Sequence, residues 1–378
     1  MQKKTKIIAT IGPVSESEEM LEKLMRAGAD CFRLNFSHGD HREHGTRITR
    51  IRKLAKRMGR HAAIIADMQG PKMRIGKLPD DGIILKEGER IVLDCSKSTY
   101  ENGIIPLPSP VFAAGAKEGS TVYLDDGTLI IKIARKTGKR FEAVVEKGGV
   151  LFSKKGTNVP SLQIKGSILS EKDKADITFA AGASVDYIAL SFLRTAEDVR
   201  EARKYIKNPH IKIIAKIERP EALEHLDGII DASDAIMVAR GDLGIETPLW
   251  ELPIRQKEIV ERVRRKFKPV IVATQMLDSM IRNPLPTRAE VSDVANAVYD
   301  SADAVMLSGE SAQGRYPLEA VEMMSKVLES TEHTQLRHFH QPPDQKSLFL
   351  SVAKSAADIS FELKTKVIFV ETFSGESA

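Results

Sequence analysis

The chain has 378 residues, of which 42% are hydrophobic and 29% are charged, and its formal net charge is +5. This length exceeds what one small core needs, so we expect one large globular domain with smaller ones beside it. The apolar residues form no run of about 18, which argues against a membrane span, and the mild positive charge favours anionic ligands without requiring nucleic acid.

Two further features indicate the compartment. The first residues, from Met1 to Thr5, lead straight into an apolar strand and lack the hydrophobic region of a signal peptide. Cys31 and Cys95 are the only cysteines and fall in different predicted domains. A disulfide is therefore not expected, and we predict a cytoplasmic protein.

The first third of the chain alternates between strands and helices. Alternating apolar stretches predict the strands, and a capping box, in which a Ser side chain and a Glu three residues later satisfy each other's backbone N–H groups, predicts the first helix start. The basic helix has apolar residues at helical spacing, so its cations are interpreted as a solvated face rather than a nucleic-acid site. The predicted strands cover Lys6–Thr10, Asp30–Asn35 and Ala62–Ala66; the first helix follows Ser15 and Glu18 and ends at Arg26, and the basic helix covers Arg42–Arg60.

Residues 71–160 show a different rhythm. Short β-type stretches are separated by turn signals such as Asp81-Gly82 and Asp126-Gly127, and helical periodicity is weak. This pattern predicts a small all-β module inserted into the larger domain.

The strand and helix alternation resumes at Ser170. A second capping box, formed by Thr287 and Glu290, predicts a helix over Val291–Val298. With the first three strands the count reaches about eight, which a closed (β/α)₈ barrel needs; a doubly wound sheet is the alternative, but the chain lacks its Gly-rich first turn. The later strands are predicted over Tyr187–Ser191, Ile211–Ile217, Ala235–Ala239, Val270–Thr274 and Ala304–Leu307.

The C-terminal part is interpreted as the beginning of a third domain. A polar linker at Thr331–Lys346 precedes one helix, Ser347–Leu363, and one strand, Lys366–Glu371, which alone cannot bury a core. The predicted division is therefore a barrel from residues 1–70 and 161–335, an inserted lid from 71–160, and the start of a truncated α/β domain from 347–378.

Polar residues gather where the barrel strands are predicted to end, which is the active-site face of this fold. Alternation along a strand places Lys216 and Glu218 on one face, where they could hold a phosphoryl oxygen and a metal ion together. Asp242 follows the next strand and adds a carboxylate, so the set suggests a divalent metal acting on a phosphorylated carboxylic acid. The other polar strand ends carry Arg33, Asn35, Ser37, His38, Asp67, Gly241, Thr274 and Glu310.

Each of these residues also has a purely structural interpretation. Lys216 and Glu218 could form a surface ion pair, and Arg33 with Asp67 could form a salt bridge across the barrel top. His38 could cap or orient a neighbour, and Thr274 could bond a neighbouring strand end. The joint pattern, rather than any single residue, favours a catalytic site.

Several long motifs resemble the pyruvate kinase family over essentially the whole chain. The matching stretches include Arg33–Gly39, Lys155–Pro160, Lys216–Glu218, Met237–Gly244, Ala273–Leu277 and Pro286–Val298. The resemblance implies a cytoplasmic glycolytic enzyme that transfers phosphate from phosphoenolpyruvate to ADP, giving pyruvate and ATP. It also implies a TIM barrel with an inserted small β-barrel lid and a C-terminal α/β domain, assembled as a homo-oligomer, a tetramer in the family.

The same resemblance implies roles for individual residues. Glu218 and Asp242 would hold Mg²⁺, or Mn²⁺, since hard cations take oxygen ligands. Lys216 would stabilise the charge that develops on the transferred phosphoryl group, Arg33 would bind the phosphate, and the N–H groups of Gly241 and Asp242 would bind the substrate carboxylate. Thr274 would end the proton path to enolpyruvate; the implied nucleotide contacts are Asn35, His38, Arg74 and Lys155.

One departure from the family concerns the monovalent cation. Members that need K⁺ carry Thr-Lys-Gly-Pro-Glu after the third-strand Asp, whereas this chain has Met68-Gln69-Gly70-Pro71-Lys72. The Lys72 ammonium can supply the charge that K⁺ would bring. We therefore expect a K⁺-independent enzyme in which Asn35, Ser37 and Asp67 surround Lys72.

Two other functions are compatible with parts of this pattern. A metal-dependent lyase acting on phosphoenolpyruvate or pyruvate would also use Glu and Asp on Mg²⁺, but would not need an insertion carrying Arg74 and Lys155. A non-catalytic relative would have no reason to keep Arg33, Lys216, Glu218, Asp242 and Thr274 together.

Overall fold

The computed structural model describes residues 3–125, 127–160, 162, 166–333, 348–363, 365 and 367–370. The chain divides into two compact units, Met1–His333 and Thr334–Ala378, and each is described by itself. None of the helices in the described ranges is long and apolar enough to cross a membrane.

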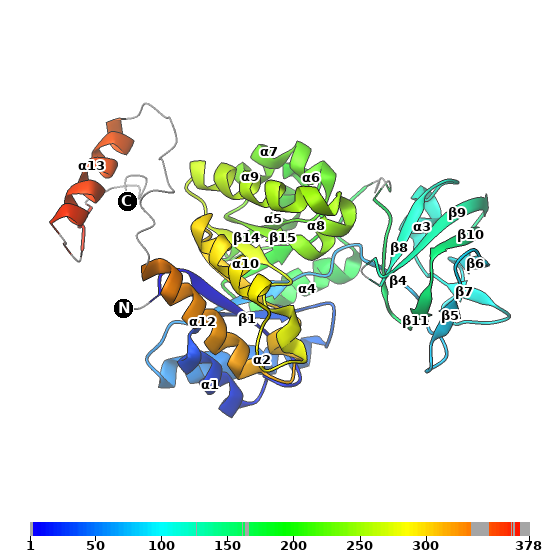
Figure 1. Cartoon of the computed structure of the whole chain (residues 1–378), viewed down its shortest axis with the longest axis horizontal. Coiled ribbons are helices and arrows are strands. Elements are labelled where there is room, and N and C mark those ends of the chain that lie inside the picture. The colour runs from blue at the N-terminus through cyan, green and yellow to red at the C-terminus, as the bar shows by residue number, and fades with distance from the viewer. Residues whose placement is uncertain are drawn as a thin grey trace. The chain divides into compact units, whose positions relative to one another are not determined.

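Eight parallel strands close into a barrel, which confirms the predicted fold class (Figure 1). The strands follow one another around the barrel in chain order, and the last, β17, pairs with the first, β1. The strands are buried on both faces, as expected where helices cover a parallel sheet. They are β1 (Lys6–Ile11), β2 (Ala29–Asn35), β3 (Ala63–Asp67), β13 (Tyr187–Leu190), β14 (Lys212–Ile217), β15 (Ala235–Ala239), β16 (Val270–Ala273) and β17 (Ala304–Leu307).

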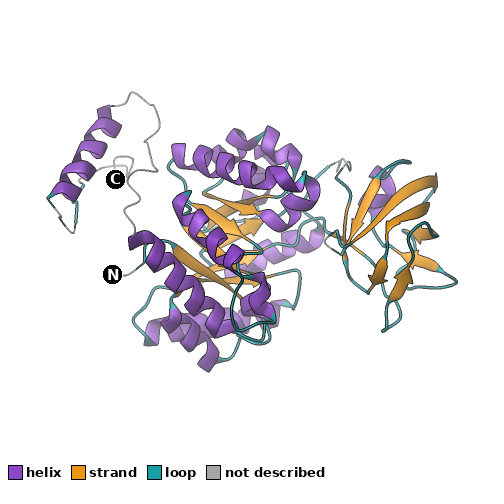
Figure 2. Ribbon diagram, in the orientation of Figure 1, coloured by secondary structure: helices purple, strands orange, loops and turns teal. Residues whose placement is uncertain are grey.

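Helices surround this barrel, and Figure 2 shows them in purple around the orange strands. The predicted capping box of Thr287 and Glu290 is present and begins α10, and a further box of Ser170 and Asp173 begins α4. The helices are α1 (Glu18–Ala27), α2 (His41–Arg57), α4 (Glu171–Gly182), α5 (Ala196–Arg203), α6 (Pro220–Glu224), α7 (Leu226–Ala232), α8 (Arg240–Glu246), α9 (Leu252–Arg265), α10 (Arg288–Tyr299), α11 (Gly309–Ala312) and α12 (Pro317–His333), with short 3₁₀ turns at Leu249–Glu251 and Asp278–Ile281.

The predicted start of the first helix was wrong by two residues. Ser17, not Ser15, is the N-cap, and its hydroxyl accepts from the Met20 N–H. Ser15 is buried, and its hydroxyl accepts from the Gly12 N–H at 3.1 Å, so it is engaged in the turn after β1. A buried Ser serves the nearest unsatisfied backbone group, which here lies before the helix rather than within it.

The basic helix α2 has the apolar inner face that its sequence predicted, with Ile48, Ile51 and Leu54 buried. Its cations pair with acidic side chains of neighbouring elements: Arg47 with Glu16 at 2.7 Å and Arg52 with Asp186 at 2.6 Å. These ion pairs give two of the helix cations a structural role, and the absence of a nucleic-acid partner stays a prediction.

The insertion after β3 is mainly β-structure, as predicted. Its core is a single apolar cluster that includes Phe112 and Phe141, which pack edge to face. A seven-stranded sheet has the order β4-β12-β8-β9-β10-β6-β7, and β5 pairs with β11. The elements are β4 (Met73–Arg74), β5 (Ile83–Leu85), β6 (Arg90–Asp94), β7 (Ile104–Pro106), α3 (Pro110–Gly115), β8 (Thr121–Leu124), β9 (Leu129–Thr137), β10 (Arg140–Lys147), β11 (Gly149–Leu151) and β12 (Gly156–Asn158).

The second unit contains the predicted helix, α13 (Leu348–Glu362). Residues 367–370 have no regular secondary structure, whereas the sequence predicted a strand there; the ends of that predicted strand, and most of the predicted linker, lie outside the described residues. The predicted domain boundaries stay a prediction.

Replacing Gly12 by Ala should destabilise the barrel by roughly 1–3 kcal/mol, because an added Cβ would lie 2.3 Å from the backbone carbonyl oxygen of Ala312. Backbone atoms cannot move aside as a flexible side chain can. Gly182→Ala is the matched control, since nothing lies within 4 Å of its Cβ position. Urea unfolding of both variants checks this expectation, and equal stabilities would contradict it.

Candidate active site

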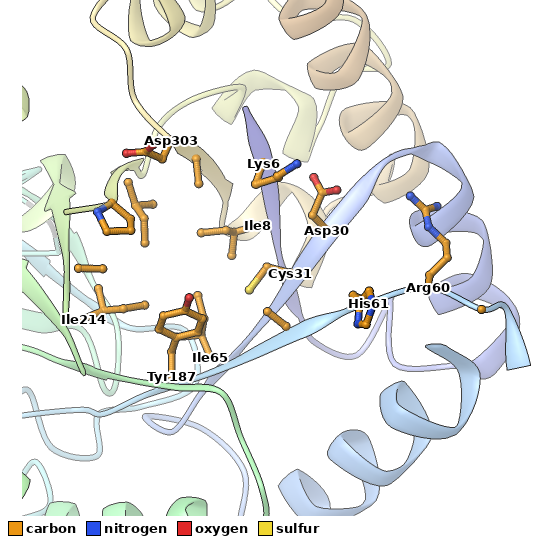
Figure 3. Close-up of a pocket in the computed structure, with 16 residues that line it drawn as sticks. Lys6, Ile8, Asp30, Cys31, Arg60, His61, Ile65, Tyr187, Ile214 and Asp303 are labelled. Atoms are coloured by element: carbon orange, nitrogen blue, oxygen red, sulfur yellow. The ribbon is translucent and has the colours of Figure 1, made fainter. Parts of the chain in front are cut away.

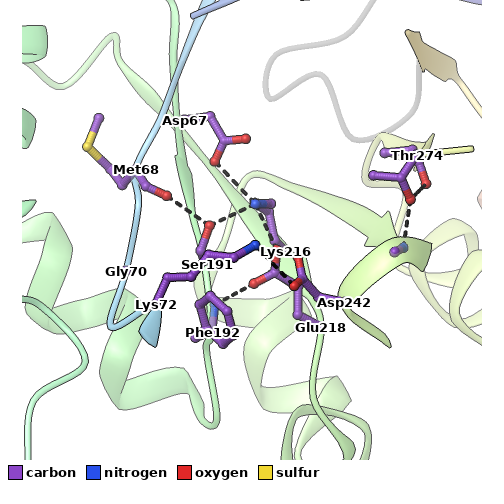
Figure 4. A network of polar contacts seen from close by, with 12 residues as sticks. Asp67, Met68, Gly70, Lys72, Ser191, Phe192, Lys216, Glu218, Asp242 and Thr274 are labelled. Atoms are coloured by element: carbon purple, nitrogen blue, oxygen red, sulfur yellow. Dashed lines mark hydrogen bonds and ion pairs between the residues drawn. The ribbon is translucent and has the colours of Figure 1, made fainter. Parts of the chain in front are cut away.

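The ammonium group of Lys216 lies at the centre of the polar strand ends (Figure 4). Its Nζ atom is 2.7 Å from Glu218 Oε1, 3.3 Å from Asp67 Oδ1 and donates a hydrogen bond of 2.7 Å to Ser191 Oγ. These partners are the residue after β14, the last residue of β3 and the residue after β13. Strand alternation therefore brings Lys216 and Glu218 together as the sequence predicted.

The charges of this cluster are buried and compensate one another. Burial by itself would lower the pKa of Lys216, but the Asp67 and Glu218 carboxylates outweigh it and hold that pKa above its ordinary value. Burial would likewise raise the pKa of Asp67, but Lys216 and Arg33 keep it below the usual range. Lys216 is thus a fixed positive charge, and Asp67 a fixed negative one.

Arg33 completes the arrangement at the end of β2. Its Nε atom donates to Asp67 Oδ2 at 2.6 Å, and its Nη1 atom donates to Thr10 Oγ1 at 3.1 Å. The salt bridge that the sequence analysis considered as a structural alternative is therefore present. Because two N–H groups of Arg33 are bonded to Asp67 and Thr10, the direction of the guanidinium is fixed. Its remaining N–H groups could bind an anion.

Glu218 and Asp242 are the two predicted metal ligands. Glu218 is buried, its Oε2 atom accepts from the Phe192 N–H at 2.7 Å, and its Oε1 atom faces the Lys216 ammonium at 2.7 Å. Burial, opposed by Lys216 and reinforced by the nearby Asp242 charge, raises the pKa of Glu218. A cation between the two carboxylates would relieve this cost, so the donor set fits a hard divalent ion.

Lys72 has a different partner from the predicted ones. Its Nζ atom lies 3.4 Å from Asp242 Oδ1, and no contact within the described ranges joins it to Asn35, Ser37 or Asp67. Asn35 Oδ1 instead accepts from the Ser37 N–H at 3.0 Å, and Asp67 is engaged by Arg33 and Lys216. The Asn35 side chain is therefore used in a local turn, and Asp67 is paired with Arg33 and Lys216, so these groups do not contact Lys72.

Ser191 and Phe192 are site residues that the sequence analysis missed as contacts. Ser191 Oγ accepts from Lys216 and donates to the Met68 carbonyl at 2.8 Å, so it orients the ammonium group. Phe192 has a left-handed backbone, with φ of 59°, which turns its N–H towards Glu218. Both residues follow β13, and the rule that strand ends carry the site would have found them.

Thr274 lies across from this cluster in a strained backbone conformation. Thr274 and Gln275 have φ values of 71° and 52°, which is rare for residues with a Cβ and costs on the order of 1–3 kcal/mol for each. Arg240 donates to the carbonyls of both residues, at 2.7 and 3.2 Å, and pairs with Asp293 at 2.7 Å. The Arg240 side chain thus holds the bend after β16.

The strained bend aims the Thr274 hydroxyl at the start of α8. Thr274 Oγ1 accepts from the Gly241 N–H at 2.7 Å and donates to the Ala273 carbonyl at 2.6 Å. A Cβ at Gly241 would lie 3.4 Å from Thr274 Oγ1, at the edge of ordinary contact. The structural alternative for Thr274, a bond to a neighbouring strand end, is therefore also present.

The predicted nucleotide residues line the junction of barrel and insertion. Arg74 Nη1 donates to the Lys154 carbonyl at 3.0 Å, and Lys155 pairs with Asp125 at 2.8 Å. Burial, together with the charges of Arg74 and Arg33, lowers the pKa of His38, which places this imidazole among cations. His38 is thus close to Arg74, and its backbone N–H donates to the Asn35 carbonyl at 3.2 Å, while the Lys155 side chain is engaged by Asp125.

A cavity of about 650 Å³ lies at the opposite end of the barrel (Figure 3). The cavity is lined by the first residues of several strands, such as Lys6, Ala63 and Tyr187, and by Ile8 and Ile214 further along their strands. The predicted catalytic residues all lie at the other ends of the strands, so this cavity is separate from the candidate site.

Buried beside the candidate site is a further acid, Glu246, at the end of α8. Asn158 Nδ2 donates to its Oε1 atom at 3.2 Å, while its Oε2 atom has no hydrogen-bond partner in the described part of the chain. Burial, opposed by Arg219, raises the pKa of Glu246 to about 7. Burial therefore favours the neutral form of this carboxyl more than it would for an exposed Glu.

Comparisons with known proteins give the family of this chain. The family profile described as "Pyruvate kinase, barrel domain" matches residues 2–321. Proteins named pyruvate kinase from Geobacillus stearothermophilus and Agrobacterium vitis are each 44% identical over all of this chain, and one from Thermococcus litoralis is 40% identical over 98% of it. The chain belongs to the pyruvate kinase family.

These members of the pyruvate kinase family are longer than the present chain. The matched region spans 66% of the Geobacillus stearothermophilus protein and 80% of the Agrobacterium vitis protein. The profile match covers the barrel strands together with the insertion, so every residue of the candidate site lies within the span shared with pyruvate kinases.

The stability advantage of the Glu246→Gln variant over the wild type should be larger at pH 8 than at pH 5. A raised carboxyl pKa means that the folded state binds the proton more tightly, so the contribution of Glu246 to stability is full below pH 4.5 and is lost as the pH rises towards 7. The Gln variant lacks this loss, and its advantage should grow by about 1–3 kcal/mol between the two pH values.

Urea unfolding with EDTA present, at pH 5 and pH 8, measures this difference. Glu118→Gln is the control, because Glu118 is exposed on the insertion. An advantage of the Glu246 variant that does not change with pH would contradict the expectation.

Proposed function

We propose that this protein transfers the phosphoryl group of phosphoenolpyruvate to ADP, giving pyruvate and ATP, as the glycolytic pyruvate kinase reaction. The observation that carries the proposal is the buried Lys216 ammonium, held by Asp67, Glu218 and Ser191 beside the Arg33 guanidinium. Phosphoryl transfer depends on fixed positive charge at the group that moves, and this cluster offers two fixed cations.

Glu218 and Asp242 are the proposed ligands of Mg²⁺, with Mn²⁺ as an alternative ion. When bound, the ion would offset the negative charge of the substrate phosphate and carboxylate. Clusters of three or more His, Cys, Asp or Glu side chains suited to a metal are absent from the described residues. Two carboxylates leave several coordination positions for substrate oxygens and water, which is typical of Mg²⁺ sites that handle phosphates.

The protein groups then have separate tasks in the proposed reaction. Arg33 binds the phosphate, and Lys216 stabilises the negative charge on the phosphoryl oxygens while the bond to the enolate oxygen breaks. The first N–H groups of α8, at Gly241 and Asp242, receive the substrate carboxylate. Because the Gly241 N–H is bonded to Thr274 Oγ1, binding of the carboxylate is coupled to the orientation of the Thr274 hydroxyl.

Loss of the phosphoryl group leaves enolpyruvate, which gains a proton at carbon to become pyruvate. Thr274 is the proposed end of the path that delivers this proton through water. Asn35, His38, Arg74 and Lys155 are the proposed nucleotide contacts. The cations among them favour a nucleotide over a lyase reaction, since a lyase has no second phosphate chain to bind.

The proposed enzyme does not require K⁺. The support is the Lys72 ammonium, 3.4 Å from Asp242, which brings a monovalent positive charge to the edge of the proposed metal site. We further propose a cytoplasmic enzyme that assembles as a homo-oligomer; Cys31 and Cys95 are both free thiols, which suits a reducing compartment.

Pyruvate formation from phosphoenolpyruvate and ADP, with Mg²⁺ in buffer free of K⁺, tests the proposed reaction. Lys216→Met should lower kcat by about 10³-fold, because it removes the cation nearest to the developing charge. Lys212→Met, an exposed change on the same strand, should leave the rate unchanged. A wild-type protein that forms no pyruvate with or without K⁺, or a Lys216 variant of full activity, would overturn the proposal.

Replacing Lys72 by Glu should make the rate depend on K⁺. The change removes the ammonium and adds a carboxylate beside Asp242, so activity in K⁺-free buffer should fall about tenfold or more and recover in part with K⁺. The wild type should respond equally to K⁺ and Na⁺ at constant ionic strength. Lys77→Glu, on the surface of the insertion, is the control. Strong activation of the wild type by K⁺ would contradict the proposed K⁺ independence.

A further inference from the structure

The insertion meets the barrel through a narrow neck formed by β4 and β12. These strands are the first and last of the insertion, and they pair antiparallel, with Gly156 opposite Arg74 and Thr157 opposite Met73. Any rotation of the insertion relative to the barrel must pass through this pair. Contacts from the neck to the barrel therefore decide where the neighbouring Arg74 and Lys155 side chains lie.

One such contact joins the neck to α8. Asn158, the last residue of β12, donates from Nδ2 to Glu246 Oε1, and both residues are nearly inaccessible, with 3% and 6% of their surface exposed. Glu246 is four residues after Asp242 on α8, so the two carboxylates lie on the same side of this short helix. The neck is thus bonded to the helix that carries a proposed metal ligand.

A second buried contact reaches the residue beside the other proposed ligand. Arg219 directly follows Glu218, is 3% exposed, and donates from Nη2 to the Leu162 carbonyl at 2.7 Å. Leu162 lies a few residues after Asn158, on the same return segment of the insertion. Arg219 also donates to the Glu221 carboxylate, from Nε at 3.1 Å and from Nη2 at 2.9 Å, so its guanidinium is oriented from two sides.

Stability alone does not account for a carboxylate at position 246. Its Oε2 atom is buried with no hydrogen-bond partner in the described ranges, and the Asn158 amide and the Arg219 charge offset only part of the desolvation cost, since the pKa of Glu246 stays above its ordinary value. The acid therefore needs another explanation, and its bond to the neck offers one.

We propose, on the basis of the proposed phosphoryl transfer, that Glu246 is a positioning residue: its hydrogen bond with Asn158 holds the neck against α8 and so sets the nucleotide-binding side chains of the neck relative to Asp242. Arg219 fixes the same segment beside Glu218. Occupation of the proposed metal site at Glu218 and Asp242 and the orientation of the insertion are thereby linked through two buried polar contacts.

Steady-state kinetics separate this role from a merely structural one. Glu246→Ala removes the acceptor and should raise the KM for ADP about tenfold while kcat at saturation changes little, because Lys216 and Thr274 are untouched. Glu246→Gln keeps a carbonyl oxygen that accepts from Asn158, so its KM for ADP should stay near the wild-type value. Glu142→Ala, at an exposed position on β10 of the insertion, is the matched control.

A double-mutant cycle tests whether Asn158 and Glu246 act as one unit. If they do, Asn158→Ala should raise the KM for ADP as Glu246→Ala does, and the double variant should be no worse than either single one. Additive effects, or a Gln variant as impaired as the Ala variant, would overturn the proposal. Thermal unfolding of each variant identifies any that fails to fold.

A distance measurement tests the neck without any turnover. In a background with Cys95→Ser, spin labels on cysteines introduced at exposed Glu87 of the insertion and Lys204 of the barrel report their separation. Glu246→Ala should broaden the distance distribution, and Glu246→Gln should not. A wild type that makes no pyruvate would refute the proposed reaction alone, whereas an unchanged distribution in the Ala variant would refute the positioning role.

Discussion

The constraint on which the rest of the site depends is the burial of the Lys216 ammonium. A buried cation without partners would lose its proton or disrupt the fold, so its three partners must be present together. They come from three neighbouring strand ends, and the parallel pairing of β13 with β3 and with β14 brings Asp67, Ser191 and Glu218 to one point. The order of these three strands and the charge balance of the site are consequently one requirement rather than two.

The charges around Lys216 are matched before any substrate arrives. Arg33, Lys72 and Lys216 face Asp67, Asp242 and Glu218, each cation paired with at least one carboxylate. A site that is already neutral can receive an anionic substrate together with a divalent cation without accumulating charge. The side chains are also held in place by protein partners, so little reorganisation is needed when a reaction begins.

Sequence reasoning predicted this site where local rules are strict. Strand alternation fixed the relation of Lys216 to Glu218, and the strand-end rule found Arg33, Asp67, Asp242 and Thr274. It failed where competition between partners decides the outcome. Lys72 pairs with Asp242 because Asp67 is already satisfied by two cations, and Ser15 serves Gly12 rather than the helix; neither choice can be read from spacing.

The contact between Asn158 and Glu246 was beyond sequence reasoning for a different reason. The two residues are 88 positions apart and neither lies at the end of a barrel strand. Only the path of the insertion back to the barrel brings them together. Long-range polar pairs of this kind depend on tertiary geometry, whereas caps and strand faces depend on residues a few positions away.

The strained bend at Thr274 limits which substitutions this segment can accept. Two adjacent left-handed residues are kept in place by the Arg240 guanidinium, which is therefore committed to their backbone carbonyls. Relaxing the bend would gain conformational energy but move the threonine hydroxyl away from Gly241. Under the proposed role of Thr274, substitutions that relax the bend should stabilise the protein and slow the reaction.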